Sequence, residues 1–200
     1  MHYRIGTRGS KLALVQSEYV KKRMEEAYPE DTFELVIIKT TGDKVTDKPL
    51  AAIGTKGLFV REIEEELLSG SIDMAVHSMK DMPAECETGL TFAKAWKRED
   101  CRDVLILNTA GSFSELPSGA VIGTGSLRRA CQLAMLRPDI RFTAIRGNVD
   151  TRINKLRDDS YGLDGIVLAA AGLNRLGRSP EITEYLDPEV VIPAPAQGVL

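Results

Sequence analysis

Segments typical of β-strands alternate with segments typical of helices along most of the chain. Residues 3–7 have strand character and precede an amphipathic stretch from Lys11 to Ala27, and the same succession recurs in the second half. A helix between two strands carries the chain back across the sheet, so that the next strand runs parallel to the first. The sequence therefore predicts an α/β fold with mixed, mostly parallel sheets flanked by helices.

In the first half, Ser10 is the expected N-cap of the helix at 11–27, and Leu12, Val15, Tyr19 and Val20 are its expected buried stripe. A polar loop should cover 40–56, because Gly42, Pro49 and Gly54 interrupt it. The other expected elements are strands at 33–39, 73–76 and 90–96, and a helix marked by Phe59, Ile63 and Leu67 that ends at Gly70.

In the second half, the charged run 97–100 is the best candidate for a hinge between two domains. Val149, Ile153 and Leu156 share one face of an expected helix, and the small residues of 165–170 suit a fully buried strand. The remaining expected elements are strands at 103–107, 120–124, 140–145 and 190–192 and helices at 127–136, 173–177 and 180–186.

Composition excludes several classes of protein. The net charge of −3 does not favour binding to nucleic acid or to a membrane surface, and no apolar run is long enough to span a bilayer. The chain begins in a strand-like segment without a signal-peptide core. Cys86, Cys101 and Cys131 form no metal-ligand pattern, so we expect no metal, reduced thiols and a cytoplasmic location.

Residues 73–83 combine a short strand with a polar turn. Ser78 and Asp81 fit a helix-start pattern, but Pro83 limits the helix to about one turn. Lys80 and Asp81 are thereby held at the carboxyl end of a strand, where open α/β sheets bind ligands. The alternative interpretation is a capped turn with a surface ion pair.

Arginines recur where a strand ends and a helix begins. A cation at a helix N-terminus opposes the helix dipole, so a repeated arrangement of this kind indicates a bound anion. The guanidinium group suits carboxylate or phosphate because it presents paired donors in one plane. The alternative is that these arginines are solvated or paired with Asp139, Asp150 or Asp158. The three places are Arg8 before Ser10, Arg128 and Arg129 after Thr124 and Ser126, and Arg146 and Arg152 around Asn148.

Other residues give weaker signals. Gly123-x-Gly125 lacks the third glycine of a dinucleotide fingerprint. We interpret His77 as a hydrogen-bonded structural histidine and Cys131 as a small packed residue.

Ordered motifs along the whole chain resemble the porphobilinogen deaminase (hydroxymethylbilane synthase) family. That resemblance implies a transferase of tetrapyrrole and haem biosynthesis, which condenses porphobilinogen head to tail into linear hydroxymethylbilane and releases ammonia. The motifs are Thr7-Arg8-x-Ser10-x-Leu12-Ala13-Leu14, Thr41-Gly42-Asp43, Lys56-Gly57-Leu58-Phe59-Val60, Ala75-Val76-His77-Ser78-Met79-Lys80-Asp81, Gly123-Thr124-x-Ser126-Leu127-Arg128-Arg129, Arg146-Gly147-Asn148-Val149-x-Thr151-Arg152 and Gln197-Gly198.

The resemblance also implies roles for particular residues. Asp81 would be the catalytic carboxylate, which binds pyrrole N–H groups, assists ammonia loss and stabilises a cationic azafulvene. Lys56 and Phe59 would lie on a mobile loop, and Gln197 is a further candidate. The residues that would hold substrate or cofactor carboxylates are Arg8, Ser10, Lys80, Thr124, Ser126, Arg128, Arg129, Arg146, Asn148 and Arg152.

The family's first two domains resemble the hinge pair of type II periplasmic binding proteins. Domain one would be 1–96 with a return segment at 193–200, and domain two would be 101–192. In the family a dipyrromethane cofactor is joined to a cysteine of a third domain, beyond the motif that matches Gln197-Gly198. We therefore expect these 200 residues to be a partial or inactive core, monomeric and without covalent dipyrromethane. The alternative is a hinge-type binding module for a small polyanion, without catalysis.

Overall fold

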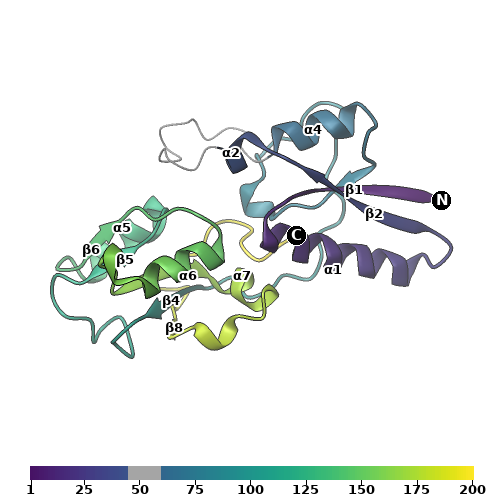
Figure 1. Cartoon of the computed structure of the whole chain (residues 1–200). Helices are drawn as coiled ribbons and strands as arrows, with labels where there is room; N and C mark the ends of the chain where they lie inside the picture. Colours follow the sequence, from purple (N-terminus) through teal and green to yellow (C-terminus); the bar gives the residue numbers. More distant parts are fainter. Residues whose placement is uncertain (45–59) are drawn as a thin grey trace. The chain divides into compact units, whose positions relative to one another are not determined.

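The computed structural model describes residues 1–44 and 60–200, so the predicted loop residues Lys56 and Phe59 lie outside the described part. The chain separates into two compact units, Met1–Arg98 with Val199–Leu200, and Glu99–Gly198. Each unit has its own sheet and helices (Figure 1). The domain limits expected from the sequence stay a prediction.

Unit 1 is built on parallel strands in the order β2-β1-β3. Gly6 lies in the central strand, where an added Cβ would come within 2.3 Å of the Ile72 side chain, so the tight packing of this strand requires glycine. Its elements are β1 (His2–Arg8), α1 (Lys11–Ala27), β2 (Thr32–Ile38), α2 (Thr41–Lys44), α4 (Arg61–Leu68), β3 (Met74–Ala75) and the single 3₁₀ turn η1 (Met79–Asp81).

Helix α1 has the predicted bounds, and its predicted buried face is correct for Val20 but not for Tyr19. Ser10 caps it as expected, accepting a hydrogen bond from the Ala13 backbone N–H at 3.3 Å. The face that is buried contains Gln16 and Ser17, because their side chains find hydrogen-bond partners inside the unit. Tyr19 is 48% exposed, so its predicted place in the core is wrong.

Unit 2 contains a mixed sheet in the order β6-β5-β7-β4-β8, in which β4 is antiparallel to its two neighbours and the other pairs are parallel. Along β4, Leu105 and Leu107 pack into the core cluster on the α5 side, whereas Val104 and Ile106 pack into the cluster with α6 and α7. The elements are β4 (Asp103–Leu107), β5 (Val121–Gly123), α5 (Leu127–Leu136), β6 (Arg141–Thr143), α6 (Val149–Arg157), η2 (Asp159–Tyr161), β7 (Gly165–Ala169), α7 (Ala170–Arg175), η3 (Ser179–Glu181) and β8 (Glu184–Tyr185).

Three predicted elements are wrong. Residues 90–96 form no strand, because most of their side chains are exposed and no neighbouring strand pairs with them. The helix expected at 180–186 is only the turn η3, followed by β8, which pairs with β4. Residues 190–192 turn instead of pairing, since the backbone N–H groups of Val190 and Val191 both donate to the Asp187 carbonyl.

Candidate functional site

The helix-start loops of unit 2 lie side by side at one edge of its sheet. β5 and β6 are parallel neighbours, and the Thr124 backbone N–H donates to the Thr143 carbonyl where both strands end. The loops that lead into α5 and α6 are so closely packed that a Cβ on Gly125 would lie 3.0 Å from the Ile145 carbonyl oxygen. The carboxyl ends of parallel strands thus bring together the predicted residues that the sequence separates by some twenty positions.

At the start of α5, Ser126 and Thr124 fix the backbone while the arginines extend from it. The Ser126 side chain accepts from the Arg129 backbone N–H at 3.4 Å, and the Thr124 hydroxyl accepts from the Ser126 N–H at 3.2 Å. Both hydroxyl groups therefore have a structural partner, in agreement with Ser126 as an N-cap. Asn148 occupies the N-cap position of α6 but makes no side-chain capping bond, and it is exposed.

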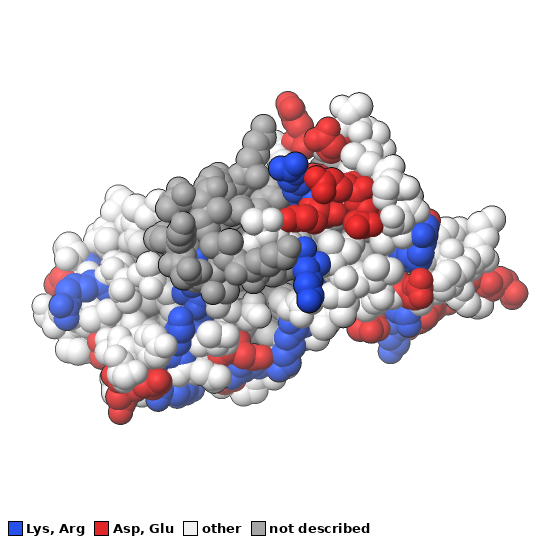
Figure 2. All heavy atoms as spheres, turned by 45° about the horizontal axis from the view of Figure 1, so that its top comes forward, with Lys and Arg blue, Asp and Glu red and all other residues white. Residues whose placement is uncertain are grey.

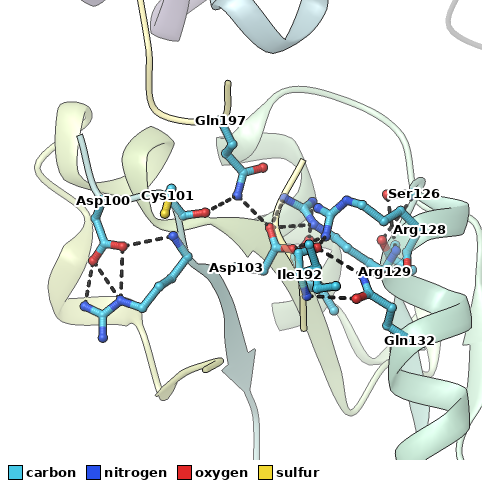
Figure 3. Close-up of polar contacts among 12 residues, drawn as sticks. Asp100, Cys101, Asp103, Ser126, Arg128, Arg129, Gln132, Ile192 and Gln197 are labelled. Carbon is cyan, nitrogen blue, oxygen red and sulfur yellow. Dashed lines mark hydrogen bonds and ion pairs between the residues drawn. The ribbon is translucent and has the colours of Figure 1, made fainter. Parts of the chain in front are cut away.

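Arg128 and Arg129 share one buried carboxylate, Asp103 (Figure 3). Arg129 places Nε and Nη2 at 3.0 and 2.7 Å from Asp103 Oδ1, and its Nη1 donates to the Val167 carbonyl. Arg128 Nη1 lies 2.7 Å from Asp103 Oδ2 and also donates to the Ile192 carbonyl. Burial raises the pKa of Asp103, but the charge of Arg129 and the hydrogen bonds from its neighbours outweigh burial and hold that pKa below its usual value.

Arg128, Arg129, Arg146 and Arg152 form what we call the arginine cluster of unit 2. In this cluster, the positive charge of Arg152 is the least compensated by acidic side chains. It is partly buried and donates from Nε to the Gly147 carbonyl at 2.8 Å, and no carboxylate of the described residues forms an ion pair with it. Burial, and after it the charges of Arg129 and Arg146, lower the pKa of Arg152. A guanidinium group under such repulsion indicates an excess of positive charge at this sheet edge, which an anion would relieve.

The acids that the sequence offered as alternative partners are engaged elsewhere. Asp139 pairs with Arg137, whose hydrogen bond lowers the Asp139 pKa to about 2. Asp150 pairs with Arg178, and Asp158 accepts from the Ser160 backbone. The partner that the structure shows for Arg128 and Arg129 is instead Asp103, which the sequence analysis missed; its only signal was a charged residue at the start of a wholly apolar strand.

Unit 1 gathers a second group of predicted residues at the carboxyl ends of β1 and β3. Arg8 ends β1, and the turn η1 carries Lys80 and Asp81, both exposed. The Met79 backbone N–H donates to the Val199 carbonyl, which anchors this turn. The predicted short strand followed by one turn is confirmed, although Ser78 does not cap the turn and instead lies 3.1 Å from the Gln16 side-chain amide.

His77, next to this turn, is held neutral. Burial, and after it the charge of Arg8, lowers the His77 pKa to about 4. The sequence predicted a hydrogen-bonded ring, but no hydrogen bond of the His77 ring is found among the described residues.

Two further predictions need correction or refinement. Cys131 was expected to be packed, but it is exposed on α5. Gln197 is 1% exposed, and its side-chain amide donates to the Cys101 carbonyl at 2.7 Å and to Asp103 Oδ1 at 2.9 Å. It therefore supports the arginine cluster from inside unit 2.

The described surface also carries acidic side chains. Figure 2 shows acidic side chains gathered on one part of the surface, and α4 carries glutamates at positions 62, 64, 65 and 66. Within the described ranges, no group of three or more His, Cys, Asp or Glu residues is placed to hold a metal ion. No helix of that part of the chain is long and apolar enough to cross a membrane.

The fold is that of the type II periplasmic binding proteins. A probable amino-acid ABC transporter extracellular-binding protein, ytmK of Bacillus subtilis, matches with a TM-score of 0.52 and 14% identity, over 90% of this chain and 75% of that one. The periplasmic VFT2 domain of Bordetella pertussis BvgS matches with a TM-score of 0.51 and 13% identity, over 93% and 76%. At these identities the likeness concerns the fold alone.

The chain belongs to the porphobilinogen deaminase family. Residues 3–200 match the family described as porphobilinogen deaminase, dipyromethane cofactor binding domain. A porphobilinogen deaminase of Lachnospira eligens is 95% identical over the whole chain, which covers 68% of that protein. A porphobilinogen deaminase of Clostridioides difficile is 54% identical over the whole chain, which covers 66% of that protein. The chain thus spans about two thirds of the length of these relatives.

Proposed function

We propose that this chain forms the substrate-binding and catalytic core of a porphobilinogen deaminase, which condenses porphobilinogen head to tail into hydroxymethylbilane and releases ammonia. The main support for the proposal is that unit 2 of this family member brings several arginines together at one end of its sheet. Porphobilinogen bears an acetate and a propionate, so every added pyrrole brings two more carboxylates. A growing chain of such units needs many cationic donors.

The arginine cluster suits these carboxylates in chemistry and in charge. Arg128, Arg146 and Arg152 present planar donors at one sheet edge, and burial together with the charges of Arg129 and Arg146 lowers the pKa of Arg152, which supports an anion there. A bound carboxylate would restore that balance through charge-assisted hydrogen bonds. Ser126, Thr124 and Asn148 would contribute through the backbone N–H groups of the helix starts that they shape.

The dipyrromethane cofactor of the family carries the same acetate and propionate groups, so the same donor set fits it. When bound, it supplies the terminal pyrrole to which the first substrate is joined. In this chain the arginines of the cluster would hold its carboxylates.

In unit 1, Asp81 would act on the reacting pyrrole. Its carboxylate lies exposed on η1 beside Lys80, where an acceptor can receive pyrrole N–H groups and offset positive charge as ammonia leaves. Arg8, Lys80 and Ser10 would bind the substrate carboxylates next to it. We expect a monomeric cytoplasmic enzyme that acts on this small molecule.

Ammonia release from porphobilinogen tests the proposal in protein expressed from its complete reading frame. Asp81→Asn keeps the shape of the side chain and removes its charge, so turnover should fall at least a hundredfold with an unchanged melting temperature. The matched control is Asp73→Asn, which breaks an ion pair with Arg4 at the other end of the same strand region and should leave turnover unchanged.

Two results would contradict the proposal. Wild-type protein that binds porphobilinogen without releasing ammonia would be a binding module. Asp81→Asn protein with turnover within tenfold of wild type would remove the catalytic role from Asp81.

A further inference from the structure

The buried carboxylate of Asp103 contacts both arginines at the start of α5, and the side-chain amide of Gln197 bonds to the same carboxylate. Asp103 is fully buried, and each of its oxygens faces a different guanidinium group. Gln197 adds a third donor to Oδ1, on the side of Arg129. Asp103 Oδ1 therefore has three protein donors, whereas Oδ2 has the ion pair with Arg128 and no hydrogen-bond partner among the described residues.

Arg128 and Arg129 depend on Asp103 to different degrees. Arg129 keeps a backbone anchor at the Val167 carbonyl, and its side chain is only 8% exposed. The Arg128 side chain is 26% exposed, and the same Nη1 atom makes its ion pair with Asp103 and its hydrogen bond to the Ile192 carbonyl. The orientation of the more accessible arginine therefore rests on one carboxylate oxygen and one carbonyl oxygen.

We propose that Asp103 is a positioning residue. Its Oδ2 atom pairs with Arg128 and thereby fixes the orientation of the Arg128 guanidinium group before the anionic ligand binds. This inference rests on the proposed function for the identity of the ligand. An arginine that is fixed before binding loses less side-chain freedom when a carboxylate arrives, and its planar donors already have the direction that bidentate binding needs.

The Asp103→Asn substitution should affect the contact with Arg128 and the contact with Arg129 differently. Three donors, from Arg129 and Gln197, converge on Oδ1, so the amide oxygen of asparagine should take that position. The amide NH₂ group would then replace Oδ2 and face the Arg128 Nη1 group, and two donors cannot bond to each other. Arg128 should lose its orientation while Arg129 keeps its partners.

A double-mutant cycle tests this coupling. It uses wild type, Asp103→Asn, Arg128→Leu and the double variant, with kcat and KM for porphobilinogen and, separately, the affinity for benzenehexacarboxylate, an unreactive polyanion. Each single variant should lower kcat/KM and polyanion affinity at least tenfold. In the Arg128→Leu background, Asp103→Asn should change neither quantity by more than twofold. Asp164→Asn is the matched control. The Asp164 carboxylate accepts a hydrogen bond from the Val121 backbone N–H at the opposite end of the same sheet, so this substitution should leave both quantities unchanged.

Additive losses in the double variant would overturn the inference, because Asp103 would then act independently of Arg128. Tighter polyanion binding by Asp103→Asn would also overturn it, since Asp103 would then compete with the ligand. If Asp103→Asn alone does not fold, Arg128→Leu and the double variant, which has the net charge of wild type, still give the decisive comparison. Failure of the proposed function would appear separately. The polyanion affinities of the four proteins would then show the coupling, but the wild-type protein would release no ammonia from porphobilinogen.

Discussion

The stability of unit 1 should fall between pH 7 and pH 5 because of His77. Its pKa is lowered from 6.5 to about 4 in the folded chain, so the unfolded state takes up a proton in this interval and the folded state does not. Folding stability rises with pH wherever the unfolded state binds more protons, and the His77 contribution is therefore lost as the pH falls from about 6.5 towards 4. For these two pKa values the loss between pH 7 and pH 5 is about 2 kcal/mol.

Urea unfolding of the 200-residue chain at both pH values, followed by the fluorescence of Trp96 in unit 1, measures this loss. His77→Gln cannot take up the proton, so its stability should fall by about 2 kcal/mol less than that of wild type over the same interval. His2 and the acidic residues are present in both proteins, and their contributions cancel in the comparison.

Equal pH dependence in the two proteins would refute the reasoning. An NMR titration gives an independent check, because the ring protons of His77 should shift with a midpoint near 4. A midpoint near 6.5 would show that neither burial nor Arg8 acts on the ring as the structure indicates.

Two other predictions concern the core and the cysteines. Leu133 is fully buried on the core-facing side of α5, so Leu133→Ala should cost about 2–5 kcal/mol in a urea unfolding experiment, and a loss below 1 kcal/mol would contradict its place in the core. The purified 200-residue chain should have the intact mass of the bare polypeptide; an added mass of two linked pyrroles, which peptide mapping would be expected to locate first at the exposed Cys131, would contradict this expectation.

Local sequence signals predicted those parts of the fold that local interactions determine. The helix at 11–27 and the helix at 127–136 have the predicted bounds, because Ser10 and Ser126 cap them by bonds to the backbone three residues ahead. The strand at 103–107 was also correct, since its apolar run is buried on both faces.

Elements that depend on distant partners were not predictable in this way. Residues 184–185 form a strand only because β4 offers an edge to them, and residues 190–192 turn because the Asp187 carbonyl takes two of their N–H groups. The buried face of α1 contains polar Gln16 and Ser17 beside the predicted Val20, because Ser78 and Thr7, from other segments, bond to them.

In the candidate site, too, the local features could be predicted from the sequence and the contacts between distant residues could not. Arginines at strand ends could be recognised from the sequence because the pattern is local and conflicts with the helix dipole. Their partner Asp103 could not, because the pairing joins residues that are 26 positions apart and depends on β4 running antiparallel beside β7.

The affinity for porphobilinogen of a variant at Arg152 tests the account most directly. Measured by calorimetry in the Asp81→Asn protein, so that the ligand is not consumed, Arg152→Met should bind at least tenfold more weakly. Its melting temperature should change little, because the substitution removes a hydrogen bond to the Gly147 carbonyl but also a partly buried cation that Arg129 and Arg146 repel. Arg157→Met, at the exposed far end of the same helix, is the control and should bind as the parent does. Unchanged affinity of Arg152→Met together with a lower melting temperature would contradict the claim that this cluster is built to bind the carboxylates of a ligand.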